Sequence, residues 1–212
     1  MAEEFQHSRA ITSNDAALTD IRTKAETALT HGAADKSHAF HLPALATIGM
    51  DGKPMVRHLI LRAASPTGRT LHFYTDSRSQ KLIEIDRNPD VNLVFYDPSA
   101  GVQLRVEGVA TQGDKGQAEQ AWRNLSPLGR RAYTAISGTG QPLEQPSSAL
   151  PTHLEGRIPE AGEVESGFAN FTLICVTYDA FDWLSLSRAG NRRAQFSWQS
   201  TSKNWAGGWF VP

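Results

Sequence analysis

Two arginines enclose the apolar run of the hexapeptide RHLILR, residues 57–62. A fixed guanidinium at each end suits the binding of a phosphate or a carboxylate, because this group donates paired hydrogen bonds to such anions. On a regular strand Arg57 and Arg62 point to opposite faces, since they are five residues apart. Both reach one ligand only where a β-bulge shifts the alternation or the ligand wraps the strand edge. The competing interpretation is a pair of solvated surface arginines.

A second candidate anion site opens the segment SRSQKLIEIDRNP, residues 77–89. The N-terminus of a helix offers free N–H groups and a positive partial charge. Arg78, Lys81 and two serine hydroxyls stand at this expected helix start, which predicts a cradle for a phosphate group. The structural alternative is an ordinary capping box formed by Ser77 and Gln80, with a solvated lysine beside it.

The segment VQLRVEGVAT, residues 102–111, alternates apolar and polar side chains. This alternation predicts a strand with one wet or ligand-facing side, and Gln103 lies on that side. Its amide both donates and accepts hydrogen bonds, so it can pair with the edge of a flavin or of a nucleobase. A sheet face in contact with water explains the pattern equally well.

Composition and motif content argue against several other functions. The chain has 212 residues and a formal net charge of −1, so no basic field draws it to nucleic acid or to an anionic membrane. Its single cysteine, Cys175, cannot form a disulfide within one chain, and no spacing of histidines, cysteines and carboxylates indicates a metal site. No apolar run approaches the ~18 residues of a membrane span, and the first residues do not resemble a signal peptide. We therefore expect a cytoplasmic protein.

The elements that must position these residues are predicted from apolar spacing and turn residues. A helix is expected over residues of about 14–31, capped by Asn14 or Asp15 and closing near Gly32. Residues of about 138–167 are rich in Gly, Pro, Ser and Glu, and they predict a long loop.

Strands account for most of the remaining chain, because short β-branched and aromatic runs alternate with turn residues. The first two are expected to form a hairpin around Asp51-Gly52. Strands are predicted over residues 41–49, 55–62, 69–76, 91–97, 102–111, 168–178, 181–186, 194–199 and 205–211, and short helices over 77–89, 114–125 and from 126 onward. Consecutive strand–turn–strand units predict one domain over residues 1–212, mainly β with appended helices, built as an antiparallel barrel or sandwich.

Taken in order, these motifs resemble the pyridoxamine 5'-phosphate oxidase family of FMN-binding split β-barrels. The resemblance extends over residues of about 40–212, and it rests on RHLILR, HFYTDSRSQK, RNPDVNLVFY, VQLRVEG, DWLSLSRAGNRR and WFVP. It implies an antiparallel split β-barrel that binds FMN. It also implies a homodimer with FMN at the subunit interface and a small-molecule substrate.

The resemblance further implies a set of cofactor-binding residues. Arg57 and Arg62 would contribute side chains, one toward the phosphate and one toward the ring system. Arg62 replaces the lysine of many family members, and a fixed cation there would favour electron density on the reduced flavin. Arg78 would stand in for a phosphate-binding arginine that this chain lacks. The implied FMN set is Arg57, His58, Leu59, Ile60, Leu61, Arg62, Tyr74, Thr75, Arg78, Lys81, Gln103, Gln141, Trp183 and Arg193, the last two reaching the flavin of the partner.

The substrate site departs from the family pattern. In the oxidases a tyrosine, an arginine and a serine on the middle helices hold the substrate phosphate, and their counterparts here are Trp122, Ser126 and Arg130. A later arginine and histidine are replaced by Ala189 and Asn191. The resemblance thus implies a related flavoprotein branch, for which pyridoxamine 5'-phosphate is a poor substrate.

Two functions fit these observations. The first is an FMN-dependent oxidoreductase, in which a small substrate gives a hydride to the flavin. The second is a non-catalytic module that holds flavin or haem as a sensor or store, because the sequence supplies no unmistakable general base and a fold does not fix a function. The sequence does not determine the catalytic residues, the substrate or the electron acceptor.

Overall fold

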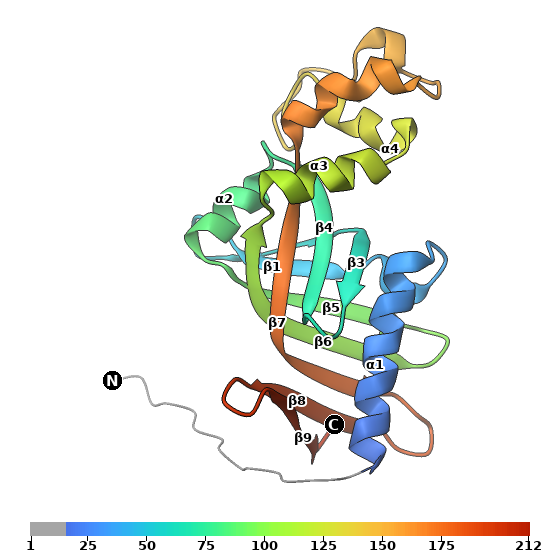
Figure 1. The fold of residues 1–212 in the computed structure, drawn as a ribbon, viewed down its shortest axis with the longest axis vertical. Helices are drawn as coiled ribbons and strands as arrows, with labels where there is room; N and C mark the ends of the chain where they lie inside the picture. The colour runs from blue at the N-terminus through green and yellow to red at the C-terminus, as the bar shows by residue number, and fades with distance from the viewer. Residues whose placement is uncertain (1–15) are drawn as a thin grey trace.

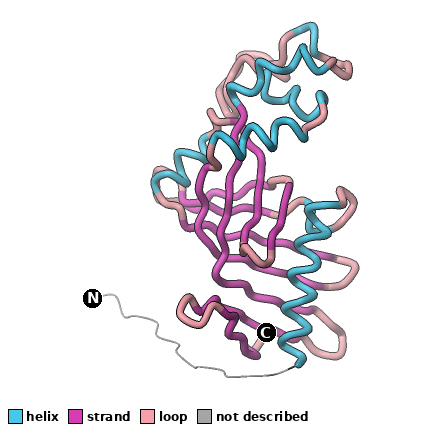
Figure 2. Tube along the Cα trace, in the orientation of Figure 1, coloured by secondary structure: helices cyan, strands magenta, loops and turns pink. Residues whose placement is uncertain are grey.

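The computed structural model describes residues 16–212, which form an antiparallel sheet with helices packed around it (Figures 1 and 2). The strands are β1 (Ala44–Ile48), β2 (Pro54–His58), β3 (Leu61–Ser65), β4 (Thr70–Asp76), β5 (Asp90–Asp97), β6 (Val102–Gln112), β7 (Phe171–Ser185), β8 (Arg192–Gln199) and β9 (Asn204–Phe210). The α-helices are α1 (Ala16–Ala34), α2 (Gln80–Arg87), α3 (Lys115–Asn124) and α4 (Pro127–Arg131), and the 3-10 helices are η1 (Ala39–His41), η2 (Ala132–Thr134), η3 (Thr152–Leu154) and η4 (Ala161–Asn170). The predicted fold class is confirmed. None of the helices between residues 16 and 212 is long and apolar enough to cross a membrane.

The sheet curls until its two edges approach each other without pairing. Its strand order is β2-β1-β5-β6-β7-β4-β3, with β8 and β9 branching from β7. β2 and β3 therefore lie at opposite ends of the path, although only Leu59 and Ile60 separate them along the chain. So short a connection spans at most about 11 Å. The sheet must consequently roll into a barrel that remains open along the seam between β2 and β3.

The prediction of one strand over residues 55–62 is wrong, because this stretch crosses the seam. β2 pairs with β1, which confirms the predicted hairpin, whereas β3 pairs with β4. A register shift between Leu61 and Ala63 places an irregularity at Arg62. Side-chain alternation alone does not reveal such a break, since the chain is extended on both sides of it. RHLILR is thus the link between the two edges of the barrel.

β7 is one strand of 15 residues where the sequence predicts two. Its first half pairs with β4 and its second half with β8, while β6 pairs along most of its length. β6 shifts register between Glu107 and Gly108. A Cβ atom at Gly108 would lie 2.4 Å from the carbonyl oxygen of Thr177, so only glycine allows the two backbones to approach this closely.

Two apolar clusters lie at different levels of the molecule. The main cluster fills the barrel and includes the inner side of α1, whereas the second joins α3 to the first residues of β7. Figure 1 shows α3 near one end of the barrel. α1 extends past its predicted end to Ala34, and Gly32 lies inside it. A Cβ at Gly32 would lie 2.8 Å from Phe40, so this glycine serves close packing and not helix termination. Asn14 and Asp15, the predicted caps, lie outside the described residues.

The segment predicted as a long loop over residues 138–167 carries the 3-10 helices η3 and η4. η4 begins with a capping box of Glu160 and Glu163, and the Arg157 guanidinium binds Glu163 with Nη1 2.8 Å from Oε2. Near its end, Phe168 packs against Trp122, with ring centroids 5.6 Å apart. A 3-10 helix has three residues per turn and lacks the 3.6-residue period of an α-helix, so the apolar spacing did not predict η3 and η4.

Candidate functional site

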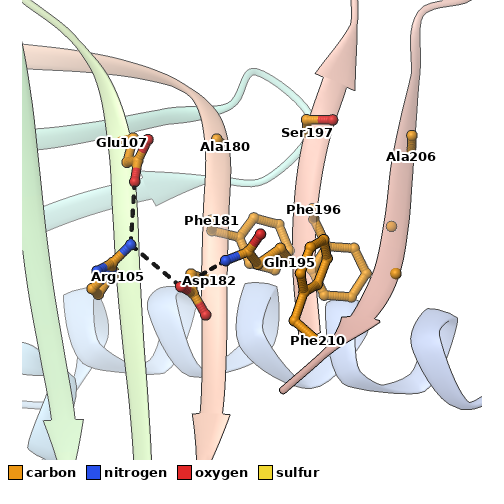
Figure 3. A pocket seen from close by; sticks show the side chains of 12 residues that line it. Arg105, Glu107, Ala180, Phe181, Asp182, Gln195, Phe196, Ser197, Ala206 and Phe210 are labelled. Carbon is orange, nitrogen blue, oxygen red and sulfur yellow. Dashed lines mark hydrogen bonds and ion pairs between the residues drawn. The ribbon is translucent and has the colours of Figure 1, made fainter. Parts of the chain in front are cut away.

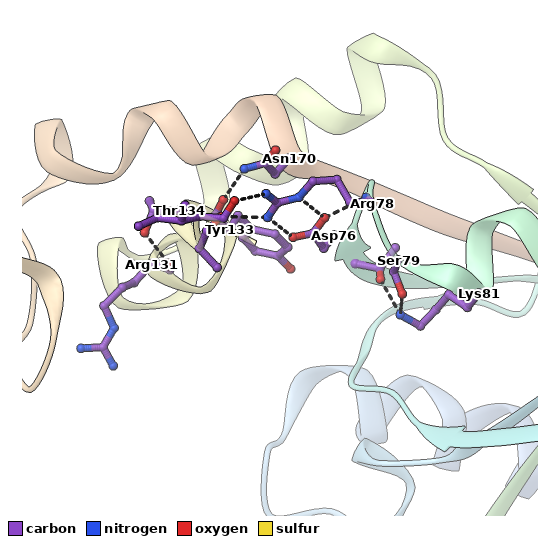
Figure 4. A network of polar contacts seen from close by, with 11 residues as sticks. Asp76, Arg78, Ser79, Lys81, Arg131, Tyr133, Thr134 and Asn170 are labelled. Atoms are coloured by element: carbon purple, nitrogen blue, oxygen red, sulfur yellow. Dashed lines mark hydrogen bonds and ion pairs between the residues drawn. The ribbon is translucent and has the colours of Figure 1, made fainter. Parts of the chain in front are cut away.

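The start of α2 gathers hydroxyl groups around one ammonium group. Ser79 is the N-cap residue, yet its hydroxyl caps no backbone N–H and instead contacts Nζ of Lys81 (Figure 4). The hydroxyl of Thr75, near the end of β4, lies 2.9 Å from the same Nζ. The alternative of a capping box from Ser77 and Gln80 is wrong, because Gln80 is already the first helical residue. Lys81 therefore stands at the helix N-terminus, as expected for an anion cradle.

Lys81 shares this corner with the guanidinium of Arg57. Burial lowers the pKa of Lys81, and the positive charge of Arg57 lowers this pKa further, against the opposing effects of Asp76 and Glu84. Two cations held this close repel each other, and a bound anion would relieve both the repulsion and the cost of burial. The electrostatics of the corner therefore favour a negatively charged ligand.

Arg57 is held in place by a buried carboxylate. Its Nη2 donates to Oε2 of Glu84 at 2.6 Å, and its Nη1 donates to the hydroxyl of Thr47. That hydroxyl donates in turn to Glu84 at 2.6 Å. Glu84 is only 2 % exposed, whereas the Arg57 side chain retains 22 % of its exposure. Arg57 and Lys81 together outweigh Glu84, so this group of three residues keeps a positive charge.

Arg62 lies on the other side of the seam, with its guanidinium carbon 5.2 Å from the centroid of the Tyr74 ring. Its Nε is buried and has no hydrogen-bond partner within residues 16–212. A buried donor without a partner costs roughly 1–3 kcal/mol, so the position is suited to a ligand that brings an acceptor. This orphaned donor fits the ring system of the flavin that the family resemblance implies, whose carbonyl oxygens and ring nitrogens accept hydrogen bonds.

The residues between the two arginines offer mainly backbone to a ligand. Leu61 is fully buried in the main cluster, and Leu59 packs against that cluster. The ring Nδ1 of His58 lies 3.2 Å from the carbonyl oxygen of Leu42. Ile60 is exposed at the seam. A cofactor contact by Leu59 or Leu61 would therefore involve main-chain atoms.

Arg78, predicted as a substitute phosphate ligand, is engaged in a structural contact. Its Nε and Nη2 donate to the two carboxylate oxygens of Asp76 at 3.0 and 2.7 Å, and Nη2 also donates to the carbonyl of Ala135 at 3.0 Å (Figure 4). The carboxylate of Asp76 raises the pKa of Arg78. These bonds tie the end of β4 to the turn after η2. Lys81 is therefore the cation available in the predicted cradle.

Gln103, Trp183 and Arg193 lie far from that corner along the sheet. Thr172 of β7 pairs with Thr75, and Trp183 follows further along the same strand. At about 3.3 Å per residue, the strand covers roughly 36 Å between these two positions. One chain thus presents two separate groups of predicted cofactor residues. Gln141 belongs to neither group and is exposed in the segment after η2.

Arg193 and Trp183 also point to opposite sides of the sheet. Arg193 binds the carboxylate of Asp182, with Nη2 2.6 Å from Oδ2, whereas Trp183 is half-buried against the main cluster. Asp182, Arg105 and Gln195 line a cavity of about 330 Å³ between β6 and β9 (Figure 3). Nε of Arg105 is buried there and lacks a hydrogen-bond partner among the described residues.

Trp122 and Arg130, the predicted substrate residues, do lie together. The guanidinium carbon of Arg130 is 5.1 Å from the Trp122 ring centroid, and both side chains bind Glu165. Tyr133 packs edge-on to Trp122, and burial raises the pKa of its hydroxyl to about 12. Sequence analysis missed Glu84, Glu165 and Tyr133. Of these three, only Glu84 could have been found from the sequence, because it lies next to the apolar Ile85 in a predicted short helix, where a carboxylate on the buried side needs a counter-charge.

Comparisons with known proteins point to an FMN-binding family. Residues 16–113 match the family described as pyridoxamine 5'-phosphate oxidase, FMN-binding domain. A putative pyridoxamine 5'-phosphate oxidase of Caenorhabditis elegans is 37% identical over 87 residues, which are 41% of this chain and 37% of that protein. A pyridoxine/pyridoxamine 5'-phosphate oxidase of Leptospira interrogans is 29% identical over 128 residues, 60% of this chain and 51% of that protein. The matches thus span about a third to a half of the length of these curated relatives.

Two crystal structures share the fold. A pyridoxamine 5'-phosphate oxidase-related, FMN binding protein of Nostoc punctiforme superimposes with a TM-score of 0.70 at 24% identity, covering 89% of this chain and 96% of that one. PhzG of Burkholderia lata, in complex with tetrahydrophenazine-1-carboxylic acid, gives a TM-score of 0.69 at 14% identity, covering 96% and 100%. At these identities the likeness establishes the architecture, which is the open, curled sheet of the split barrels.

Proposed function

We propose that this chain, whose residues 16–113 belong to the pyridoxamine 5'-phosphate oxidase-like family of FMN-binding proteins, is an FMN-dependent oxidoreductase acting on a small substrate. The observation that carries the proposal is the corner where Nζ of Lys81 lies 2.9 Å from the Thr75 hydroxyl, beside the Arg57 guanidinium that Glu84 holds at 2.6 Å. Two adjacent cations, two hydroxyls and a helix N-terminus suit a terminal phosphate. FMN is favoured over FAD, because the sequence contains no dinucleotide-binding fingerprint.

FMN, when bound, would supply the redox chemistry by accepting a hydride from the substrate. The chain would bind and orient it. Lys81 and Arg57 would hold the phosphate, with Glu84 fixing the Arg57 guanidinium. Arg62 would donate from its buried Nε to the ring system, and its fixed charge would favour the reduced state. Tyr74 would keep the Arg62 guanidinium in place through ring contact.

A homodimer would complete the site. Thr75 pairs with Thr172 near the start of β7, whereas Trp183 lies near its end. The length of β7 keeps the two groups of predicted cofactor residues apart in one chain. The outer face of β2 and β5 exposes Val56 and Tyr96, at 66 % and 48 %. Tyr96 pairs directly with Gln103, so this apolar face continues into the second group. We expect a second copy to cover it through a two-fold contact, in which each subunit completes the other's flavin site.

The cofactor is tested by a charge reversal with a matched control. Lys81→Glu places a carboxylate where the phosphate would lie and should weaken FMN binding by ~2 kcal/mol or more, roughly 30-fold in Kd. Lys36→Glu makes the same change at an exposed lysine that has no hydrogen bond or ion pair among the described residues, and it should bind FMN as the parent does. Equal affinities for parent and Lys81→Glu would refute the assignment. The visible spectrum of the purified protein distinguishes flavin from haem.

Redox activity and assembly need separate measurements. Anaerobic bleaching of the bound flavin by amines or reduced nicotinamides supports an oxidoreductase, whereas a flavin that none of them reduces supports a non-catalytic holder. A kcat/KM for pyridoxamine 5'-phosphate well below ~10⁴ M⁻¹s⁻¹ is expected from the altered substrate residues. Sedimentation is expected to give a dimer. A stable monomer with stoichiometric FMN would contradict the shared site.

A further inference from the structure

One buried carboxylate lies beside the predicted cofactor residues Gln103 and Arg193. Asp182 of β7 is 7 % exposed. Its Oδ2 accepts from Nη2 of Arg193 at 2.6 Å and from Nε2 of Gln195 at 3.2 Å. Nη2 of Arg105 lies 3.3 Å from the same oxygen, and Figure 3 shows Asp182 between Arg105 and Gln195. Donors from both neighbouring strands, β6 and β8, therefore meet at this one carboxylate.

The sheet register places Asp182 on the same face as the two predicted flavin contacts. Gln103 pairs with Leu184, and Leu184 pairs with Arg193, so these side chains form a row across β6, β7 and β8. Asp182 precedes Leu184 by two positions on β7, and side chains two positions apart on a strand point to the same face. Asp182 is therefore one step along the sheet from residues that are predicted to contact the flavin.

Arg193 depends on this carboxylate for its orientation. Its Nε lies 3.0 Å from Oδ1 of Asp182 and its Nη2 lies 2.6 Å from Oδ2, so the two groups meet through a pair of parallel hydrogen bonds. Such a pair fixes the plane of the guanidinium. The third nitrogen, Nη1, has no hydrogen-bond partner within residues 16–212, and the side chain is 29 % exposed. Nη1 is thus the donor that Arg193 can offer to a ligand.

Asp182 also reduces the positive charge that Arg193 presents to such a ligand. A carboxylate beside a guanidinium cancels part of its field. Through the guanidinium, the carboxylate would lie roughly 8 Å from an acceptor bound to Nη1. At an effective dielectric constant of ~20, a unit charge at that distance changes an equilibrium constant at least about tenfold. Since a fixed cation beside the flavin ring favours the reduced state, the charge of Asp182 should oppose reduction.

We propose that Asp182 is a positioning residue for the flavin: it directs Nη1 of Arg193 toward the ring system bound by the partner subunit, and it lowers the reduction potential by partly neutralising that guanidinium. The inference rests on the proposed FMN-dependent function and on the shared site of the homodimer. A purely structural carboxylate would affect the stability of the sheet and leave the relative affinity for reduced and oxidised flavin unchanged.

The test is the reduction potential of FMN bound to the full-length chain, measured by redox titration against a dye of known potential. Asp182→Asn keeps the shape of the side chain and one acceptor oxygen, but removes the charge. It should favour reduced over oxidised FMN about tenfold more than the parent does, an upward shift of about 30 mV for a two-electron couple. Asp179→Asn is the matched control and should keep the potential of the parent, because Asp179 is an exposed carboxylate of the same strand with no hydrogen bond or ion pair among the described residues.

A double-mutant cycle shows whether Arg193 transmits the effect. The upward shift caused by Asp182→Asn should vanish in a chain that already carries Arg193→Gln. If Asp182→Asn does not fold, the same substitution is made together with Arg105→Gln, which restores the net charge of the cluster, and its potential is compared with that of Arg105→Gln alone.

Three results would overturn the role of Asp182: an unchanged or lower potential in Asp182→Asn, an equal shift in Asp179→Asn, or a shift that persists with Arg193→Gln. A parent that binds no FMN would overturn the FMN-dependent function and this inference with it. A flavin-loaded parent with the same potential as Asp182→Asn would overturn the inference alone, so the two failures are distinguishable.

Discussion

Replacing Glu84 by Gln separates the structural and the ligand-binding roles of the Arg57 corner. The substitution keeps the shape of the side chain and removes its charge. Arg57 then loses the carboxylate that accepts from its Nη2 at 2.6 Å, and Lys81 loses a charge that supports its protonated form. The substitution is expected to lower stability without weakening FMN binding.

The expected loss of stability follows from how deeply the Arg57–Glu84 pair is buried. Breaking a fully buried ion pair costs about 3–5 kcal/mol, because one charge is left without compensation. Glu84 is 2 % exposed, but the side chain of Arg57 keeps 22 % of its exposure, so water compensates part of the loss. We therefore expect Glu84→Gln to lower the free energy of unfolding by about 2–3 kcal/mol. For a chain of this size, that loss lowers Tm by roughly 4–12 °C.

The assay is thermal unfolding at fixed protein concentration without added FMN, followed by FMN titration. Asp20→Asn is the control, because the Asp20–Lys24 pair is exposed, at 58 % and 72 %, and its loss should barely move Tm. Glu84→Gln should bind FMN as tightly as the parent or more tightly, since the positive charge of the corner rises. An unchanged Tm would refute the buried pair, and a large loss of affinity at unchanged fold would refute the placement of the phosphate beside Arg57.

Three further predictions concern single residues. A bound phosphate favours the charged form of Lys81, so the pKa of Lys81 should be higher in the FMN complex than in the free protein, where it is lowered. The contribution of Lys81 to FMN affinity should therefore be complete below the pKa of Lys81 in the free protein and disappear as pH rises through its pKa in the complex. In FMN titrations from about pH 7 to about pH 11, Lys81→Arg should lack this transition, because arginine stays charged. Gly108→Ala should destabilise the chain by about 1–3 kcal/mol in denaturant unfolding, whereas Gly162→Ala, where a Cβ meets nothing within 4 Å, should not. Asp114→Ala removes the acceptor of the Gln117 N–H in the capping box of α3 and should cost about 1 kcal/mol, seen as a lower Tm.

The sequence alone determined most of the local elements. The helix that starts after Asp114, the helix that starts after Ser126 and the turn around Gly52 were predicted, because each depends on residues within a few positions of one another. The alternation of β6 gave the correct polar side for Gln103 and Arg105. The identity of Lys81 and its place at a helix N-terminus likewise indicated an anion site before any long-range contact was known.

Only the tertiary structure decided which of these residues act together. RHLILR crosses from one edge of the sheet to the other, because β2 and β3 find partners that lie far apart in the chain. Arg57 meets Glu84 across 27 positions, and Arg130 meets Glu165 across 35. The continuous β7 separates Trp183 from Thr75 along its length. Such pairings depend on how a long sheet curls and on which buried charges find a counter-charge, and neither is encoded in the spacing of neighbouring residues.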